Sequence, residues 1–123
     1  MSEIKIRIRY AEVDRMGFVY HSNYLVFLEM GRTEWLRQNG TSYDEMEKSG
    51  IFLPVVNIEI KYRKPAYYDD IICVNTIVKK ENSRSITFSY KIIRDNEILI
   101  EASSKHIYMN KDGKAIAYNR DKG

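Results

Sequence analysis

"RYAEVDRMGFVYHSNYLVFLEMGRTEWLRQNG", residues 9–40, decides the fold, because the stretch begins with the alternation of a strand and ends with the period of a helix. From about Ser22 the apolar side chains recur at helical spacing, with Ser22 as the expected N-cap and Gly40 as the expected C-cap. The apolar stripe consists of Tyr24, Phe27, Leu28, Gly31 and Trp35, flanked by Leu25 and Leu36. We therefore predict a helix of about four turns.

Between the two patterns lies a predicted loop, residues 11–20, which contains one candidate side chain and is followed by another. Gly17 offers the backbone freedom of a turn. Asp14 precedes this glycine, and His21 directly precedes the expected start of the helix. Taken alone, an aspartate at such a position most often caps a turn, and a histidine near a helix start is most often structural. Both residues are nevertheless candidates for function.

The first strand is predicted from strict alternation over residues 3–10. One side of this strand would carry Ile4, Ile6, Ile8 and Tyr10. Beyond the long helix, the capping-box spacing of Ser42 and Glu45, followed by Gly50, predicts one short helix at the surface.

Four further strands are predicted, at about residues 52–64, 70–80, 84–94 and 97–109. The last two should form a hairpin at Asp95–Asn96. This order predicts an α+β fold with an antiparallel sheet of about five strands and one long helix, in a single domain over residues 1–123. One helix cannot cover such a sheet, so we expect a homo-oligomer in which a second copy covers the rest.

Composition excludes several classes of protein. With 44% hydrophobic and 30% charged residues, the chain resembles an ordinary globular protein, and it has neither a transmembrane segment nor the apolar core of a signal peptide. A cytoplasmic location is the resulting expectation. The net charge of +3 is too small to indicate a nucleic-acid-binding protein. One cysteine and two distant histidines provide no ligand spacing for a metal, so we expect neither a metal nor a cofactor.

The segment "YAEVDRMGFVYHSNYLVFLEMGR", followed by "YRKPAYYDD", resembles the 4-hydroxybenzoyl-CoA thioesterase family of hotdog-fold proteins. Within that family it is similar to the small bacterial acyl-CoA thioesterases associated with the Tol–Pal system. The resemblance rests on Tyr10, Asp14, Gly17, Val19, His21, Asn23, Tyr24 and Arg32 at these spacings. It implies a curved sheet around a central helix, dimers joined sheet edge to sheet edge, and a substrate pocket at the dimer interface beside the start of the helix.

The resemblance also implies an activity, hydrolysis of an acyl-CoA to a free acid and CoA. Asp14 would attack the thioester, either as a nucleophile or as a general base on water, and an ordinary aspartate is ionised at neutral pH. The backbone N–H of His21, at the helix N-terminus, would polarise the carbonyl. Tyr10 would support Asp14, although a core tyrosine on the first strand is an equally good interpretation of that residue.

The resemblance also indicates which residues would bind the substrate. Tyr24 would line the pocket, and Lys80 and Arg84, with Arg63 and Lys64 as weaker candidates, would bind the phosphates of CoA. CoA is here part of the substrate. The basic residues fit a solvated strand edge equally well. Three questions stay open: whether the acyl carrier is CoA or an acyl carrier protein, whether the oligomer is a dimer or a tetramer, and which acyl group is cleaved. The alternative to an enzyme is a module that binds acyl-CoA without hydrolysing it.

Overall fold

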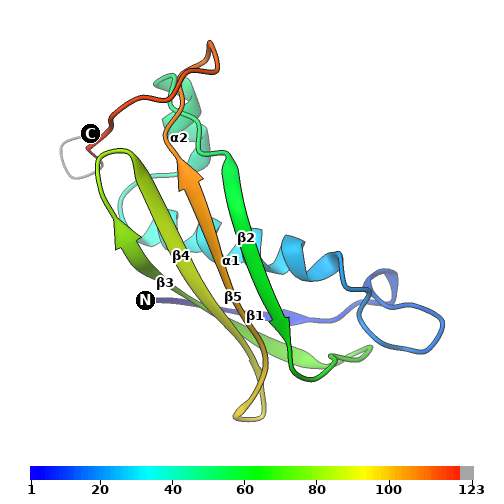
Figure 1. Ribbon diagram of the computed structural model, residues 1–123. Coiled ribbons are helices and arrows are strands. Elements are labelled where there is room, and N and C mark those ends of the chain that lie inside the picture. Colours follow the sequence, from blue (N-terminus) through cyan, green and yellow to red (C-terminus); the bar gives the residue numbers. More distant parts are fainter. Residues whose placement is uncertain (120–123) are drawn as a thin grey trace.

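The sheet of this protein has five antiparallel strands in the order β1–β3–β4–β5–β2, as seen in a computed structural model that describes residues 1–119 (Figure 1). The last four residues of the predicted domain lie outside the described part. The strands are β1 (Ser2–Arg7), β2 (Val55–Tyr62), β3 (Ile71–Glu81), β4 (Ser85–Arg94) and β5 (Glu97–Ile107). The long helix α1 (Asn23–Gln38) packs against β1, β3 and β4. The predicted α+β class and strand count are confirmed.

Helix α1 buries the predicted stripe, with Leu36 in addition, whereas Leu25 is exposed. Gly31 allows the helix to lie close to the sheet, because a Cβ atom at this position would come within 2.6 Å of Thr76 Oγ1 on β3. Ser22 occupies the N-cap position as predicted, but its side chain caps nothing, because its own backbone is already helical. The helix therefore derives its position from packing rather than from its cap.

Strands β4 and β5 form the predicted hairpin. Asp95 and Asn96 both have positive φ angles, 50° and 66°, as the tight turn of a two-residue hairpin requires. The inward side chains of β4, which are Ile86, Phe88, Tyr90 and Ile92, are fully buried. This part of the sheet forms the centre of the core.

The first strand is shorter than predicted. It ends at Arg7, and Tyr10 begins a short 3₁₀ helix, η1 (Tyr10–Glu12), in which its side chain is 74% exposed. The chain leaves the sheet because the backbone of Ile8 bonds to the loop at Asp69 and Asp70 instead of continuing along β3. Tyr10 is therefore not a core residue of the first strand.

The short helix α2 (Tyr43–Lys48) begins as predicted, with Ser42 Oγ accepting a hydrogen bond of 3.1 Å from Glu45 N–H. It is more than a surface turn, because Met46 is 3% exposed and belongs to the core. No helix within residues 1–119 has the length and apolar character needed to span a bilayer.

Candidate active site

Asp14 lies in a tight loop that folds back on itself. Its N–H donates to Phe18 O at 2.8 Å, and its own carbonyl accepts from Gly17 N–H at 3.0 Å, where Gly17 has a φ of 85°. Its carboxylate Oδ1 accepts from the N–H groups of Met16 at 2.9 Å and Phe18 at 3.2 Å. The turn-capping role is thus present. The other oxygen, Oδ2, accepts no hydrogen bond from the described residues and stays available.

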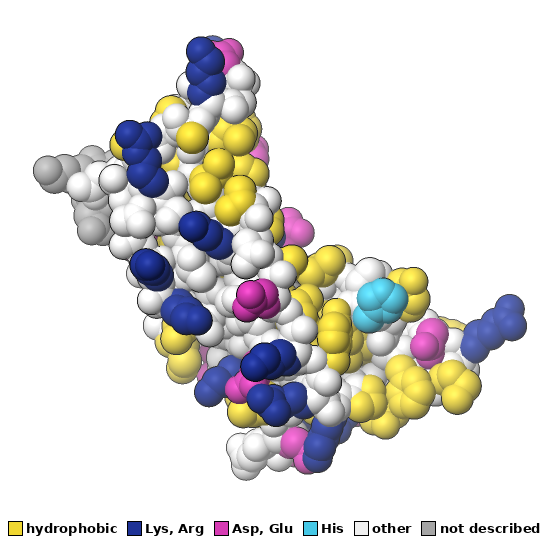
Figure 2. Space-filling model, in the orientation of Figure 1, with side chains coloured by type: hydrophobic (Ala, Val, Ile, Leu, Met, Phe, Trp, Pro, Cys, Tyr) yellow, Lys and Arg dark blue, Asp and Glu magenta, His cyan; other side chains and the backbone are white. Residues whose placement is uncertain are grey.

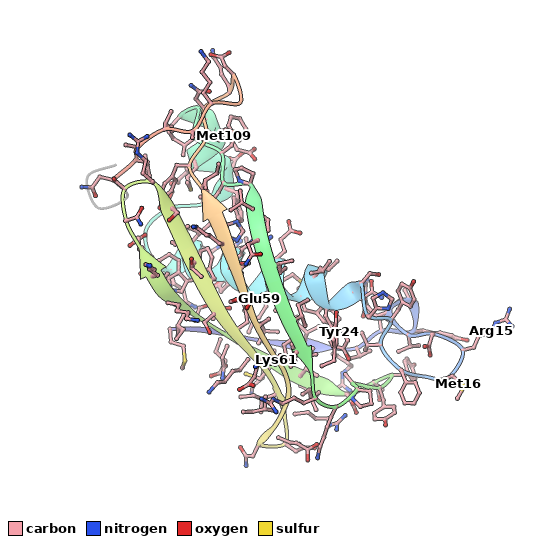
Figure 3. The ribbon with its side chains drawn as sticks, viewed as in Figure 1. Arg15, Met16, Tyr24, Glu59, Lys61 and Met109 are labelled. Carbon is pink, nitrogen blue, oxygen red and sulfur yellow. The ribbon has the colours of Figure 1, made fainter. Side chains whose placement is uncertain are left out.

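The loop leads back to the start of α1. A bridge between Val13 and Val19 and a hydrogen bond of 2.9 Å from Tyr20 N–H to Glu12 O align its two arms. The side-chain amide of Asn23, the first residue of α1, also donates to Glu12 O at 2.9 Å. These bonds bring Asp14 to the end of the molecule where the helix begins. Figure 3 shows Arg15 and Met16 at the outer tip of this loop.

Glu12 anchors this arrangement as a nearly buried carboxylate, 7% exposed. Its two oxygens accept from Arg9 N–H and Arg9 Nε, each at 2.6 Å. Burial by itself raises the pKa of Glu12, but the hydrogen bonds and charge of Arg9 outweigh it and hold the pKa below its ordinary value. Glu12 is therefore an ionised structural residue.

A second segment, residues 65–70, supports the loop from the side. Val19 N–H donates to Ala66 O at 2.9 Å, and Tyr68 N–H donates to Gly17 O at 3.1 Å. Two ring contacts join the same segments, between Phe18 and Tyr67 at 5.2 Å and between Tyr10 and Tyr68 at 5.8 Å. The second half of the family-like sequence, "YRKPAYYDD", is thus in contact with the first.

Tyr24 joins the helix to this segment. Its hydroxyl accepts a hydrogen bond of 3.0 Å from Ala66 N–H, and its ring lies 5.6 Å from that of Tyr62 at the end of β2. The side chain is 3% exposed, and burial is the main reason that its pKa is raised above the ordinary value, so the hydroxyl is neutral. In the single chain Tyr24 acts as a packing residue beside the site.

The N-terminus of α1 carries free donors. The N–H groups of Asn23, Tyr24 and Leu25 are bonded to the carbonyls of residues 20–22. The N–H groups of His21 and Ser22 donate to no acceptor within residues 1–119. The His21 imidazole is exposed and lies 4.5 Å from the ring of Tyr20. An acceptor such as a carbonyl oxygen could therefore bind here, where the helix dipole favours negative charge.

The predicted site residues fall into two groups. Asp14, His21, Tyr10 and Tyr24 lie at one end of the molecule, and Arg63 follows β2 at the same end. Arg63 is paired with Glu101, its Nε donating at 2.8 Å.

Lys80 and Arg84 lie at the opposite end, at the turn between β3 and β4 (Figure 1). Strand β3 separates them from Asp70 by roughly 30 Å. They can reach a substrate at Asp14 only from a second copy.

The arrangement suits attack on a carbonyl carbon, because a carboxylate oxygen and unpaired N–H donors lie at the same end of one rigid framework. Within residues 1–119, no group of three His, Cys, Asp or Glu side chains could hold a metal ion. Sequence reasoning overlooked Glu12, Ala66 and Tyr68, which hold the loop. Their role depends on long-range backbone bonds that no local pattern signals.

Comparison with known proteins agrees with this geometry. Residues 8–119 match the model of the thioesterase-like superfamily. YneP of Bacillus subtilis, whose name marks it as a candidate acyl-CoA thioesterase, is 42% identical over 98% of this chain and 88% of its own length. The acyl-CoA thioester hydrolase YbgC of Escherichia coli is 31% identical over 79% of this chain and 73% of its own. A DHNA-CoA thioesterase structure from Staphylococcus aureus superposes with a TM-score of 0.91 at 34% identity, covering 94% and 79% of the two chains.

Proposed function

Because the chain belongs to the thioesterase-like superfamily, we propose that it is an acyl-CoA thioesterase that hydrolyses an acyl-CoA to a free acid and CoA. The observation that carries the proposal is the position of the Asp14 carboxylate. It lies on a braced loop at the end of the molecule where α1 begins, and α1 begins with the unpaired N–H groups of His21 and Ser22. Relatives with acyl-CoA thioesterase names support the choice of substrate.

Asp14 supplies the attack on the thioester. As a general base, its Oδ2 takes a proton from water while the water oxygen bonds to the acyl carbon, and the tetrahedral intermediate then expels the CoA thiolate. As a nucleophile, Oδ2 itself bonds to the acyl carbon, the thiolate leaves, and water hydrolyses the mixed anhydride. Accumulation of an acyl-enzyme in a burst would favour the second route. Tyr10, which lies beside the loop, supports the position of Asp14.

The N–H of His21 stabilises the negative charge on the carbonyl oxygen. A well-placed donor of this kind contributes roughly 3 to 4 kcal/mol to the transition state. The dipole of α1 adds about 0.3 to 1 kcal/mol at an exposed position, so the direction of the N–H bond matters more than the field. Tyr24 forms the wall behind this position.

A second copy of the chain completes the site. The two sheet edges differ, because the exposed residues of β1 are all charged (Glu3, Lys5 and Arg7), whereas β2 also exposes apolar and aromatic side chains beside Asn57, Glu59 and Lys61, namely Val55, Val56, Ile58 and Tyr62. Charged edges resist pairing and apolar edges favour it. Figure 2 shows hydrophobic side chains exposed between β2 and the N-terminal end of α1. We therefore expect the β2 edges of two copies to meet; a dimer suffices for this contact, and a tetramer remains compatible with it.

The same pairing gives the basic residues a role. Arg63 lies at the Asp14 end of its own chain, and Lys80 and Arg84 of the second copy are the candidates for the phosphates of CoA. An acyl carrier protein would need a protein-binding surface in place of these cations. Turnover of acyl-CoA and of the same acyl group on carrier protein, compared for Arg84→Ala, distinguishes the two carriers. A cytoplasmic location remains our expectation.

The decisive experiment measures free-thiol release from short, long and aromatic acyl-CoAs. Asp14→Asn should keep the fold, because the amide oxygen can still accept from Met16 and Phe18 N–H, and it should lose at least about a hundredfold in kcat. His21→Ala should lose less. Asp69→Asn is the matched control, since Asp69 is an exposed carboxylate at the same end and its side chain pairs with Arg7. Equal turnover by the parent and Asp14→Asn would refute the mechanism.

A further inference from the structure

A cavity of about 620 Å³ lies at the end of the molecule opposite to Asp14. It is open to solvent, and it is bordered by the middle of α1, by α2, by residues 52–55 that lead into β2, and by the turn after Met109, which Figure 3 labels. Its wall is largely apolar, with Phe52, Leu53, Pro54, Val55 and Met109. The cavity belongs to none of the features that brace the Asp14 loop.

Two cationic side chains line this cavity, Arg32 in its wall and Lys111 at its exposed rim. Arg32 is half-buried, and its Nε donates to Tyr43 Oη at 2.9 Å. No carboxylate within residues 1–119 forms an ion pair with it. Glu29 and Glu47 also line the cavity, but both are exposed, and they disfavour a fully anionic ligand there. The cavity therefore suits an apolar ligand with one uncharged acceptor oxygen.

A chain of hydrogen bonds through the core ends beside the guanidinium of Arg32. His106 Nδ1 lies 3.1 Å from Leu53 O, which can only accept, so Nδ1 carries the proton and Nε2 is an acceptor. Ser104 Oγ therefore donates to Nε2 at 2.8 Å, and Tyr90 Oη donates to Ser104 Oγ at 2.6 Å. Tyr90, at the end of this chain of hydrogen bonds, lies beside the guanidinium of Arg32.

The hydrogen bond to Tyr43 uses one of the five N–H donors of the guanidinium. The structure gives the other donors no hydrogen bond within residues 1–119. The contacts of the guanidinium with Tyr43 and Tyr90 hold these free donors in position before any ligand arrives, which lowers the cost of binding.

Two-fold pairing of β2 would bring this cavity to the other copy's reaction site. In an antiparallel pair of identical strands, the first residues of one strand lie beside the last residues of the other. Val55 borders the cavity, and Tyr62, at the other end of β2, touches Tyr24 beside the start of α1. An acyl group held at the helix start of one copy would thus extend toward the cavity of its partner.

We propose that Arg32 binds an oxygen atom at the far end of the acyl group, so that this enzyme prefers acyl-CoAs that carry a distal hydroxyl or keto oxygen. This inference rests on the proposed function. Arg32 is then a specificity-determining residue, contributed by one copy to the Asp14 of the other.

The test compares matched substrates, straight-chain acyl-CoAs of several lengths with and without a terminal hydroxyl. The parent should favour the hydroxylated member at one length, and Arg32→Met should reduce that kcat/KM ratio by about ten- to a hundredfold, as expected for a hydrogen bond to a charged group. Lys111→Met, at the exposed rim, is the control and should leave the ratio unchanged. If Arg32→Met does not fold, Arg32→Lys, which loses the planar fork, should lower the ratio instead.

The outcomes separate the two proposals. Thiol release with a ratio that Arg32 variants do not change assigns Arg32 a purely structural role and overturns the inference alone. A parent without preference at any length also overturns it. No thiol release from any acyl-CoA rejects the proposed function, and the inference with it.

Mixed dimers test whether the two residues come from different copies. When Asp14→Asn and Arg32→Met chains are co-expressed, half of the dimers are mixed, and one of their two sites would have both residues intact. The preference should then return with about a quarter of the parental activity. If both residues belonged to one copy, no intact site would form, and the preference would not return.

Discussion

Acid should destabilise this protein through one buried side chain, that of His106. The imidazole is 0% exposed, and burial is the main reason that its pKa is lowered from 6.5 to about 4, with the nearby charge of Arg32 acting in the same direction. The unfolded chain therefore binds a proton between these two pKa values, where the folded chain does not. Stability should be full above about pH 6.5, fall as the pH is lowered toward 4, and then level off.

The size of the effect follows from the two pKa values. The gap between 6.5 and about 4 corresponds to roughly 3 kcal/mol, and roughly 2 kcal/mol of this should be lost between pH 7 and pH 5. Protonation would also place a second N–H donor on His106, against the hydroxyl of Ser104, which is itself a donor to Nε2 in the neutral state. The hydrogen bonds that join Tyr90, Ser104 and His106 would then have to exchange donor and acceptor.

Urea denaturation at fixed protein concentration, between pH 7 and pH 5, measures this dependence. His106→Gln should be less stable than the parent at pH 7 but should lose roughly 2 kcal/mol less on acidification. His21→Gln is the control, because His21 is the only other histidine of the chain and is exposed. The reasoning fails if His106→Gln and the parent lose the same free energy of unfolding between the two pH values.

Three further changes test the packing. Gly31→Ala should lower the free energy of unfolding by about 1 to 3 kcal/mol, because its Cβ would lie 2.6 Å from Thr76 Oγ1. The higher helix propensity of alanine does not offset this clash. Thr76→Ala should restore part of the loss, measured by urea denaturation. Ser42→Ala should lower stability by about 1 kcal/mol in the same assay, since it removes the cap of α2. Tyr24→Phe should cost about 1 to 3 kcal/mol and speed hydrogen exchange of the Ala66 amide, whose buried acceptor it removes.

Strong local signals explain which elements the sequence could predict. Helix α1 has an apolar stripe of helical period, and the β4–β5 turn has two residues that tolerate positive φ. The end of the first strand had no such signal. The alternation continues to Tyr10, whereas the chain actually turns at Ile8 because of hydrogen bonds to residues 69 and 70.

The candidate site could be predicted only in part, and for a similar reason. Asp14 and His21 were found because the motif around them resembles a family, and the loop brings them to the same end of the molecule. No local sequence pattern gives His106 a partner. Its partners are Ser104, two residues away, and Leu53, which lies more than fifty residues earlier in the chain. Pairings of this length are set by topology, which periodicity does not record.

Strand β2 shows what the sequence pattern does record. Its alternation predicts one buried face, yet Val56, Ile58 and Tyr62 are 51%, 38% and 52% exposed in the single chain. Ile58 and Tyr62 lie on the same side as buried residues of β5, because Ile58 pairs with Ser104 and Tyr62 with Ile100. Val56 lies at a bulge in the pairing with β5. Helix α1 packs mainly against β1, β3 and β4, and on this side of β2 its Tyr24 contacts the last residue, Tyr62. A strand whose alternating apolar side chains stay exposed in the single chain is typical of an interface. This is the strongest physical reason to expect that two copies share the reaction site.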